Sequence, residues 1–300
     1  MIDDDYQLVR VAGGAFSIHS KAEGETFHPV VGPVAEAQAL YVNQLKLRDR
    51  VRSQTGEFVI WDVGLGAAAN VLTALRATRD LACSLHVISF DRTIAPLQFA
   101  LRHAAELGYL EQYESAVQEL LQTNRVDFRH DQQSVRWRLH LGDFPQFLRQ
   151  PGPLPAPAPH AIMFDAFSPA KNPAMWTAPL FSDLFHVLDP ARPCAMPTYS
   201  RSTMLRVSLL LAGFYVGVGH ATGEKEETTL AANTLALIDE PLPATWLRKA
   251  RNSRSAEPLW EPIYRQAHLT PETWKKLQKH PQFSCHQQDG DALPKGVQQK

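Results

Sequence analysis

The sequence FVIWDVGLGAAAN at residues 58–70 decides the fold of this 300-residue chain. Residues 58–63 are mostly apolar and β-favouring, as expected of a strand that is buried on both faces. This run breaks at Gly64-Leu65-Gly66, and good helix formers dominate from residue 67 to 79. Strand, glycine turn and helix form the opening of a nucleotide-binding βα unit, because glycine permits a sharp turn and the helix N-terminus presents free N–H groups.

The acidic residue before the glycines distinguishes two classes of ligand. Dinucleotide-binding folds use G-x-G-x-x-G, whereas Asp62, Gly64 and Gly66 are followed here by three alanines and no third glycine. The pattern is closer to the first motif of Rossmann-like methyltransferases, whose ligand is S-adenosylmethionine. A generic strand–turn–helix stays open as an alternative, because short glycine patterns recur by chance.

Composition indicates a globular protein and gives little indication of a partner. The hydrophobic content of 44% is ordinary, and no stretch approaches the roughly twenty apolar residues that cross a bilayer. The 30 Lys and Arg balance 31 Asp and Glu, so overall charge does not indicate nucleic-acid binding. The acidic N-terminus is not a targeting signal, and three scattered cysteines indicate reduced thiols. We therefore expect a cytoplasmic protein without a metal site.

The first 50 residues predict a β-hairpin and a helix ahead of the core. Strand candidates at residues 7–11 and 15–19 flank Gly13-Gly14. An apolar stripe at residues 34–42 predicts a helix that could lie across the mouth of the cofactor site. His28, in the turn before this helix, is either a site residue or an ordinary turn histidine.

Acidic residues follow four successive predicted strands. They are Asp62, Asp91, Asp143 and Asp165, and the strands leading to the last three are residues 85–91, 135–141 and 161–164. In open α/β sheets the ligand binds at the carboxyl ends of the strands. We therefore expect these four carboxylates to share one edge of the sheet.

Each of these acids suggests a different contact with the cofactor. Asp91 lies about 25 residues beyond the glycine turn, near the place of a carboxylate that binds ribose hydroxyls. Capping of a helix that begins at Ile94 is the alternative for Asp91. In Rossmann-like methyltransferases, residues placed like Asp143 and Phe144 contact the adenine amino group and cover the adenine ring.

The rest of the chain predicts further elements around the core. Helices are expected at 94–107, 110–121, 180–188 and 203–211, a strand at 194–199, a hairpin over 214–219 and 228–237, a helix start at Thr270-Pro271, a polar linker between 121 and 135, and a proline-rich surface loop at 151–159. We expect an N-terminal extension (1–50), a Rossmann-like methyltransferase core (51–240), a C-terminal helical appendage (241–285) and a disordered tail (286–300).

The sequence DAFSPAKNPAMW at residues 165–176 closely resembles the signature of the methyltransferase domain of the MnmC family. That family completes the 5-methylaminomethyl group on the wobble uridine of certain tRNAs. Four other segments resemble the family in the same order, namely GETFH at 24–28, the helix containing Glu36-Ala37, GLG…NVL at 64–72 and GEKEE at 223–227. The similarity spans about residues 16–236.

The resemblance implies a class I S-adenosylmethionine-dependent N-methyltransferase acting on the anticodon loop of tRNA, with Asp165 as the catalytic residue. The predicted cofactor contacts are Asp62, Gly64, Gly66, Asn70, Asp91, Asp143 and Phe144, and the predicted substrate contacts are Glu25, His28, Lys171 and Trp176. Lys171 either meets a tRNA phosphate or is solvated. No second G-x-G-x-x-G follows, so we expect a stand-alone form without the FAD-dependent oxidase domain.

Other functions also fit parts of the sequence. Aminopropyltransferases share the core and a strand-end aspartate that binds an amine, and methylation of a small amine is a further alternative. A module that binds the cofactor or RNA without chemistry is suggested by Ala67 and Ala68, which replace the glycine and threonine usual in the family. The basic segment after Pro241 either contacts a polyanion or is a solvated surface.

Overall fold

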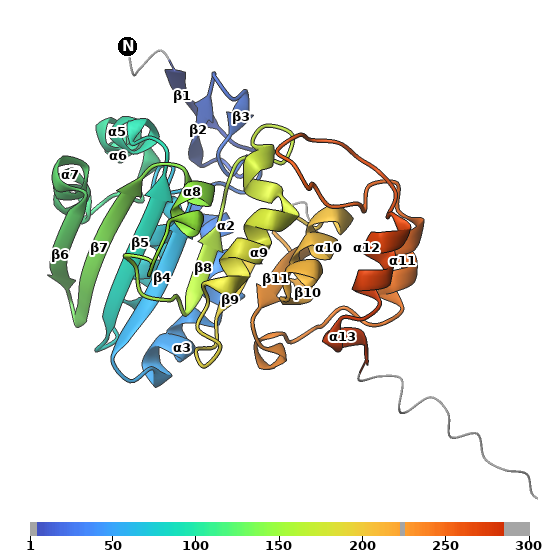
Figure 1. The fold of residues 1–300 in the computed structure, drawn as a ribbon. Coiled ribbons are helices and arrows are strands. Elements are labelled where there is room, and N and C mark those ends of the chain that lie inside the picture. Colours follow the sequence, from blue (N-terminus) through green and yellow to red (C-terminus); the bar gives the residue numbers. More distant parts are fainter. Residues whose placement is uncertain (1–4, 223–225, 285–300) are drawn as a thin grey trace, which may run out of the picture.

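An eight-stranded sheet lies at the centre of the computed structural model, which describes residues 5–222 and 226–284 (Figure 1). The predicted disordered tail and residues 223–225 of the GEKEE segment lie outside these ranges. The strand order is β10-β11-β9-β8-β4-β5-β7-β6. In that order the strands span Tyr215–Gly219, Thr228–Ala232, Ala195–Thr198, Ala161–Phe164, Glu57–Val63, Ser84–Asp91, Gln133–Leu141 and Arg125–His130.

The middle of the sheet is parallel and its order reverses at β4. Strands β5 and β7 extend the sheet to one side of β4, and β8 and β9 extend it to the other. Both β11 and β6 run antiparallel to their neighbours. In such a sheet the ligand binds where the order reverses, at the carboxyl ends of the strands. The predicted α/β fold class is therefore confirmed, and the topology directs attention to the ends of β4 and β8.

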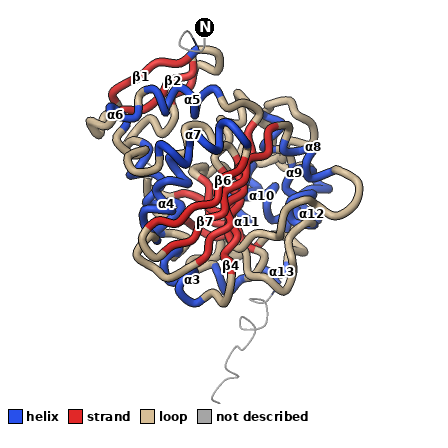
Figure 2. Tube along the Cα trace, turned by 90° about the vertical axis from the view of Figure 1, so that its left-hand side faces the viewer, coloured by secondary structure: helices blue, strands red, loops and turns tan. Residues whose placement is uncertain are grey.

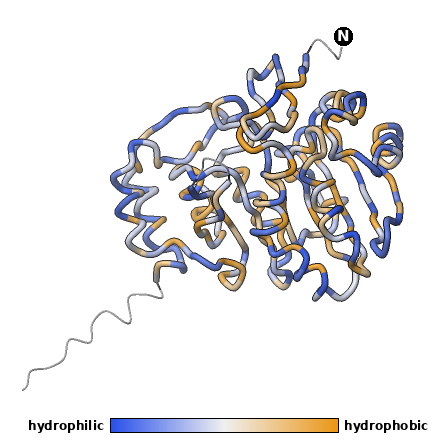
Figure 3. Tube along the Cα trace, turned by 180° about the vertical axis from the view of Figure 1, so that it is seen from behind, coloured by the Kyte–Doolittle hydropathy of each residue, from blue (hydrophilic) through white to orange (hydrophobic). Residues whose placement is uncertain are grey.

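Helices cover both faces of the sheet (Figure 2). One face carries α4 (Ala69–Thr78), with α5 (Ala95–Arg102), α6 (Ala104–Leu107) and α7 (Glu114–Thr123), and the other carries α8 (Phe144–Arg149), α9 (Ala178–His186) and α10 (Thr203–Ala212). Alternate residues of β4 supply both cores, with Phe58 and Ile60 on the α4 side and Val59 and Trp61 on the α9 side. Hydrophobic residues accordingly concentrate on the central strands (Figure 3).

The N-terminal hairpin is confirmed. Strands β1 (Tyr6–Arg10), β2 (Phe16–Ser20) and β3 (Glu25–Thr26) form a small antiparallel sheet. The helix expected at 34–42 starts as α2 (Pro33–Ala37) and continues as the π-helical segment η1 (Gln38–Asn43). Wide π-helical turns are often found at functional sites, and this one carries a buried tyrosine toward the ends of the central strands.

The polar linker expected between residues 121 and 135 is wrong. Residues 125–130 form β6, which pairs antiparallel with β7 at the edge of the sheet. Only Val126 of this strand is fully buried, and charged residues alternate with it. A half-exposed edge strand needs few apolar residues, so its composition resembles that of a loop.

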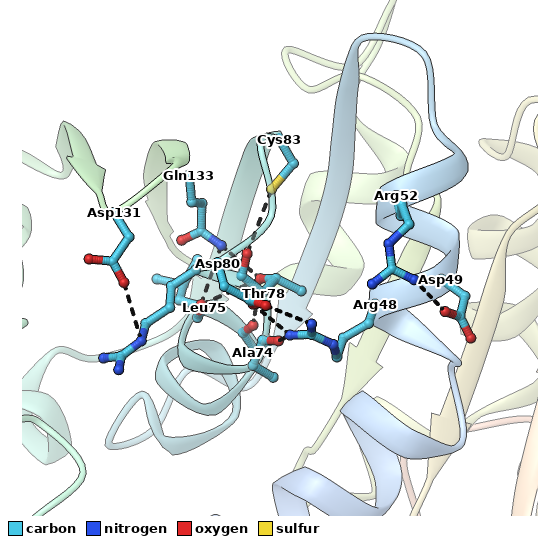
Figure 4. A network of polar contacts seen from close by, with 12 residues as sticks. Arg48, Asp49, Arg52, Ala74, Leu75, Thr78, Asp80, Cys83, Asp131 and Gln133 are labelled. Atoms are coloured by element: carbon cyan, nitrogen blue, oxygen red, sulfur yellow. Dashed lines mark hydrogen bonds and ion pairs between the residues drawn. The ribbon is translucent and has the colours of Figure 1, made fainter.

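A polar network fixes the end of the molecule that lies opposite the carboxyl ends of the strands (Figure 4). Arg48, in α3 (Leu47–Ser53), donates to Asp80 at 2.8 Å. Gln133 at the start of β7 donates to the Thr78 hydroxyl at 2.7 Å. These contacts join α3 and β7 to the last turn of α4, so the first turn of α4 is held in place beside the glycine motif.

The C-terminal part of the described chain contains α11 (Trp246–Asn252), α12 (Pro271–Leu277) and α13 (Pro281–Ser284). Two short 3-10 turns, η2 (Pro173–Trp176) and η3 (Leu235–Leu237), lie earlier in the chain. Helix α12 begins as predicted, since the Thr270 hydroxyl accepts from the Thr273 N–H. No helix within the described ranges is long and apolar enough to cross a membrane.

Candidate active site

Gly64, just after β4, lies against the backbone that follows β8. Gly64 adopts φ +94°, and a β-carbon at this position would lie 2.7 Å from the carbonyl oxygen of Asp165. The Asp165 N–H donates to the Val63 carbonyl at 2.9 Å. Only glycine fits here, so the first glycine of the motif brings Asp165 to the start of α4.

Asp165 is the centre of a polar cluster at this edge. Its Oδ2 accepts from the Asn70 side-chain amide at 2.8 Å and lies 3.6 Å from His28 Nε2. The other ring nitrogen of His28 lies 3.9 Å from Glu36 Oε1. His28 has φ +48°, an uncommon backbone conformation for a residue other than glycine. Three segments far apart in sequence therefore converge on one carboxylate, and His28 is part of the cluster rather than an isolated turn residue.

A buried tyrosine, Tyr41, and a partly buried one, Tyr199, frame this cluster. Tyr41 of η1 donates to the Phe164 carbonyl at 3.2 Å, and Tyr199 donates to the Ala166 carbonyl at 3.0 Å. Burial raises the pKa of both phenols, and the nearby carboxylates, Asp165 first among them, raise it further. Both tyrosines therefore stay neutral and hold the backbone on either side of Asp165.

Glu25 joins the N-terminal sheet to the loop after Asp165. Its carboxylate accepts from the Ser168 N–H at 3.2 Å and from the Ser168 hydroxyl. Lys171 lies on the same loop, exposed, with Nζ 3.7 Å from the position that a Gly24 β-carbon would take. The predicted substrate residues Glu25 and Lys171 thus lie on one side of the cluster, in the β2–β3 region and the signature loop.

Asp62 lies fully buried beneath the cluster. Its Oδ2 accepts from the Ser89 hydroxyl at 2.7 Å, and Ser89 in turn accepts from the Trp137 indole N–H at 2.9 Å. Its Oδ1 is buried with no hydrogen-bond partner. Burial raises the pKa of Asp62 to about 7, the Ser89 hydrogen bond opposes the rise, and the charges of Asp165 and Asp91 add to it. The group therefore changes charge near neutral pH.

Asp91 holds the glycine turn. Its carboxylate accepts from the Gly66 N–H at 2.9 Å and from the Thr93 N–H at 3.2 Å. Helix α5 begins at Ala95 without a side-chain cap, so the helix-capping alternative does not occur in this structure. Burial raises the pKa of Asp91, and its hydrogen bond from Gly66 opposes the rise. Contact with a ribose stays a prediction.

Asp143 and Phe144 have structural roles of their own. Asp143 caps α8, accepting from the Gln146 N–H at 3.2 Å. The Phe144 ring is buried and packs edge-on against Phe90 and Trp61. Asp143 does lie at the predicted edge, but contacts of these two residues with adenine stay predictions.

Trp176 differs from the other predicted substrate residues because its side chain is fully buried. Its indole N–H donates to the Phe167 carbonyl at 2.7 Å, and its ring packs edge-on against Phe164 and Tyr199. Contact of this ring with a substrate stays a prediction. The ring closes the signature loop back onto the core and so helps to position Asp165.

Sequence reasoning missed Glu36, Tyr41 and Tyr199 as parts of the site. Glu36 is buried on the apolar side of α2, and an acid on the apolar stripe of an amphipathic helix is a signal that was available in the sequence. The tyrosines gave no such signal, because a buried tyrosine usually belongs to the core.

The residues present fit S-adenosylmethionine. The unpartnered Oδ1 of Asp62 and the unpartnered Oδ1 of Asn70 are buried acceptors at the end of β4 and the start of α4. Buried acceptors without donors are uncommon, and a cationic ammonium such as that of the methionine part would supply donors. Within the described ranges no group of three His, Cys, Asp or Glu side chains is arranged to hold a metal ion.

Comparison with known proteins supports the same class of ligand. Residues 107–234 match the model of a family described as S-adenosyl-L-methionine-dependent methyltransferase. The structure of MNMC2 from Aquifex aeolicus is similar, with a TM-score of 0.65 and 22% identity, covering 91% of this chain and 82% of that one.

Two curated relatives carry the name tRNA 5-methylaminomethyl-2-thiouridine biosynthesis bifunctional protein MnmC. The one from Pseudomonas putida (strain W619) is 28% identical over 242 residues, which is 76% of this chain and 35% of the relative. The one from Aeromonas hydrophila subsp. hydrophila is 30% identical over 220 residues, which is 68% of this chain and 32% of the relative. The chain thus spans about a third of the length of these relatives.

These matches confirm the resemblance found in the sequence, the Rossmann-like methyltransferase fold and the dependence on S-adenosylmethionine.

Proposed function

We propose that this chain transfers a methyl group from S-adenosylmethionine to the aminomethyl group of wobble uridine in tRNA, a step in the formation of 5-methylaminomethyl-2-thiouridine. The observation that carries the proposal is the Asp165 carboxylate, fixed by Asn70 at the carboxyl edge where the strand order reverses. The matching signature at residues 165–176 and the names of the relatives support tRNA as the acceptor. Such an acceptor implies a cytoplasmic site of action.

The charge around Asp165 suits an amine substrate. Asp165 and Glu36 both lie within 4 Å of His28, and Glu25 accepts from Ser168 on the loop that follows Asp165. An acidic environment attracts a cationic amine and stabilises positive charge that develops on nitrogen. We therefore assign the acceptor amine to the Asp165 side of the site and the methionine part of the cofactor to Asp62 and Asn70.

The proposed mechanism uses Asp165 as an acceptor and orienting group. S-adenosylmethionine, when bound, supplies a methyl group attached to a positively charged sulfur. The attacking amine must be neutral, and the Asp165 carboxylate can accept a hydrogen bond from one of its N–H groups and so direct its lone pair. Asn70 fixes the rotamer of Asp165 through its 2.8 Å hydrogen bond. An amine that enters as an ammonium must lose one proton before it attacks, and His28, between Asp165 and Glu36, is placed to take that proton. The methylated nitrogen then carries the positive charge, and the sulfur leaves as a neutral thioether.

The experiment that tests the function uses methyl-labelled S-adenosylmethionine and bulk tRNA from cells that lack this wobble methylation. We expect label in 5-methylaminomethyluridine species after digestion and nucleoside analysis. Calorimetry of cofactor binding, run separately, establishes that the protein sample is competent. Cofactor binding without labelled tRNA would rule out tRNA as the acceptor, and the same labelled donor would then be tested with small amines.

Asp62 makes cofactor affinity dependent on pH. Because its pKa is about 7, the fraction ionised rises steeply between pH 6 and 7.5, and only the ionised form attracts an ammonium group. We expect the affinity for S-adenosylmethionine to rise roughly eightfold over this interval. Calorimetric titrations of the wild type and of Asp62→Asn measure the effect, and the variant should show weaker and nearly pH-independent binding.

The same ionisation affects stability with a definite sign. A carboxyl group whose pKa is raised on folding stabilises the protein below its unfolded pKa of about 4, and this contribution is lost as pH rises through about 7. Thermal unfolding of Asp62→Asn should lack this loss. Asp49→Asn, at an exposed carboxylate in α3, is the matched control and should behave as the wild type. If the wild type bound S-adenosylmethionine with equal affinity at pH 6 and at pH 7.5, the assignment of Asp62 as a cofactor contact would be contradicted.

A further inference from the structure

The reaction site is poorly suited to holding a polyanion. Its carboxylates suit the amine, but they repel phosphates, so an RNA substrate needs a cationic surface elsewhere. The chain as a whole has a net charge of -1. The segment 241–284 is an exception, with eight Lys and Arg against three Glu. All eight basic side chains are exposed.

A protruding loop with exposed aromatic side chains lies within this basic segment. Residues 260–268 are all exposed, and they include Trp260 (43% exposed), Ile263 (57%) and Tyr264 (41%). The loop is closed at its base, where the Ala256 and Glu257 N–H groups both donate to the Ala267 carbonyl. Large apolar residues gathered at the tip of one exposed loop indicate a binding surface.

The loop is held in a fixed position by Glu257. The carboxylate accepts from the Trp260 indole at 3.0 Å, from the Thr270 N–H at 2.8 Å and from the Thr273 hydroxyl at 2.7 Å. These bonds tie the loop to the start of α12. Lys276 of α12 places its ammonium 6.0 Å from the centre of the Trp260 ring. An aromatic face and a cation are therefore presented side by side.

The loop also lies beside the signature segment. The Ala178 N–H donates to the Leu259 carbonyl at 2.8 Å, and Thr177 pairs with Leu259 in an isolated bridge. Thr177 directly follows η2, which ends the segment that begins at Asp165. In Figure 1 the red-orange loop accordingly passes the start of α9.

A hollow opens at this junction. It has a volume of about 550 Å³, and its lining includes Pro179, Ser182, Trp260, Lys276 and Lys279. One wall is the first turn of α9, a second is the apolar C-terminal end of α10, and a third is the basic side of α12. Its mixture of an aromatic ring, a hydroxyl and two ammonium groups matches the base and phosphate of a nucleotide.

We propose that the 256–267 loop and the adjoining side of α12 form a docking surface for the tRNA substrate. Unpaired bases stack on Trp260 and Tyr264, and backbone phosphates pair with Lys276 and Lys279. This inference rests on the proposed function, since it concerns how the same substrate is held while its wobble base enters the site. It adds a binding surface outside the reaction site, in a segment distinct from the signature.

The test measures tRNA binding by fluorescence anisotropy across a salt series, together with steady-state methylation. We expect Trp260→Ala and Tyr264→Ala each to weaken tRNA binding about tenfold or more. Lys276→Gln with Lys279→Gln should lower the slope of log affinity against log salt by about two. All four substitutions should raise KM for tRNA and leave kcat and the affinity for S-adenosylmethionine unchanged.

The matched control is Arg125→Gln with Arg129→Gln, which removes two exposed charges from β6 at the opposite edge of the sheet. Tyr264→Ala keeps the test valid if Trp260→Ala does not fold. The docking surface is overturned, and the function left intact, by either of two results. In the first, every variant binds tRNA as tightly as the wild type; in the second, the β6 control loses as much affinity as the loop and α12 variants. A wild type that binds the cofactor but neither binds nor methylates tRNA overturns the function, and the docking surface with it.

Discussion

Asp165→Ala is expected to reduce methyl transfer by at least about a hundredfold while the dissociation constant for S-adenosylmethionine changes by less than about threefold. The Asp165 carboxylate lies between Asn70 and His28, with Oδ2 at 2.8 Å from the first and 3.6 Å from the second. A positioned carboxylate that accepts a proton or stabilises charge typically contributes 10²- to 10⁴-fold in rate. Cofactor affinity should be retained because Asp62 and the glycine turn remain.

Two further variants test whether the loss of methyl transfer is due to the charge of Asp165. Asp165→Asn preserves the shape of the side chain and can still accept the hydrogen bond from Asn70, but it removes the negative charge. It should therefore be nearly as inactive as Asp165→Ala. Asp183→Ala removes a carboxylate from α9 that pairs with Arg149 at the surface, and it should keep full activity. Rates come from labelled-methyl transfer to tRNA and affinities from calorimetry. Parallel loss of affinity and rate in Asp165→Ala would make Asp165 a ligand contact rather than a catalytic residue.

The carboxyl-edge residues could be predicted because buried parallel strands have a simple sequence pattern. Each of β4, β5 and β8 is a short apolar run ending at or near an acid, and the topology of such sheets places those ends together. The contact of Gly64 with the backbone of Asp165 follows from the same topology. Pattern and topology together therefore predict that these acids share one edge of the sheet.

The remainder of the site depends on tertiary contacts that no local pattern encodes. Glu36 and His28 approach Asp165 only because the N-terminal segment folds over the carboxyl edge. Whether an aromatic residue faces a ligand or the core is equally invisible in sequence, as the buried ring of Trp176 shows. Asp91 illustrates a third case, because its hydrogen bond from Gly66 connects residues 25 positions apart.

Gly64→Ala should destabilise the protein strongly, and Gly56→Ala provides a matched control. Both glycines have positive φ, +94° and +86° respectively, so an alanine at either costs about 1 kcal/mol in backbone strain. Only at Gly64 would the new methyl group meet other atoms, the Asp165 carbonyl oxygen at 2.7 Å and its carbon at 3.0 Å. At Gly56 nothing lies within 4 Å.

The extra cost at Gly64 follows from the rigidity of its neighbour. The Asp165 carbonyl belongs to backbone that is fixed by the hydrogen bond to Val63, so relief requires the ends of β4 and β8 to separate. We expect Gly64→Ala to lower the free energy of unfolding by at least about 2 kcal/mol more than Gly56→Ala, given the usual cost of overpacking. Urea unfolding measures this difference, and calorimetry should show cofactor binding lost in Gly64→Ala alone. Equal destabilisation by the two substitutions would mean that the strands separate freely, and Gly64 would then not be what positions Asp165.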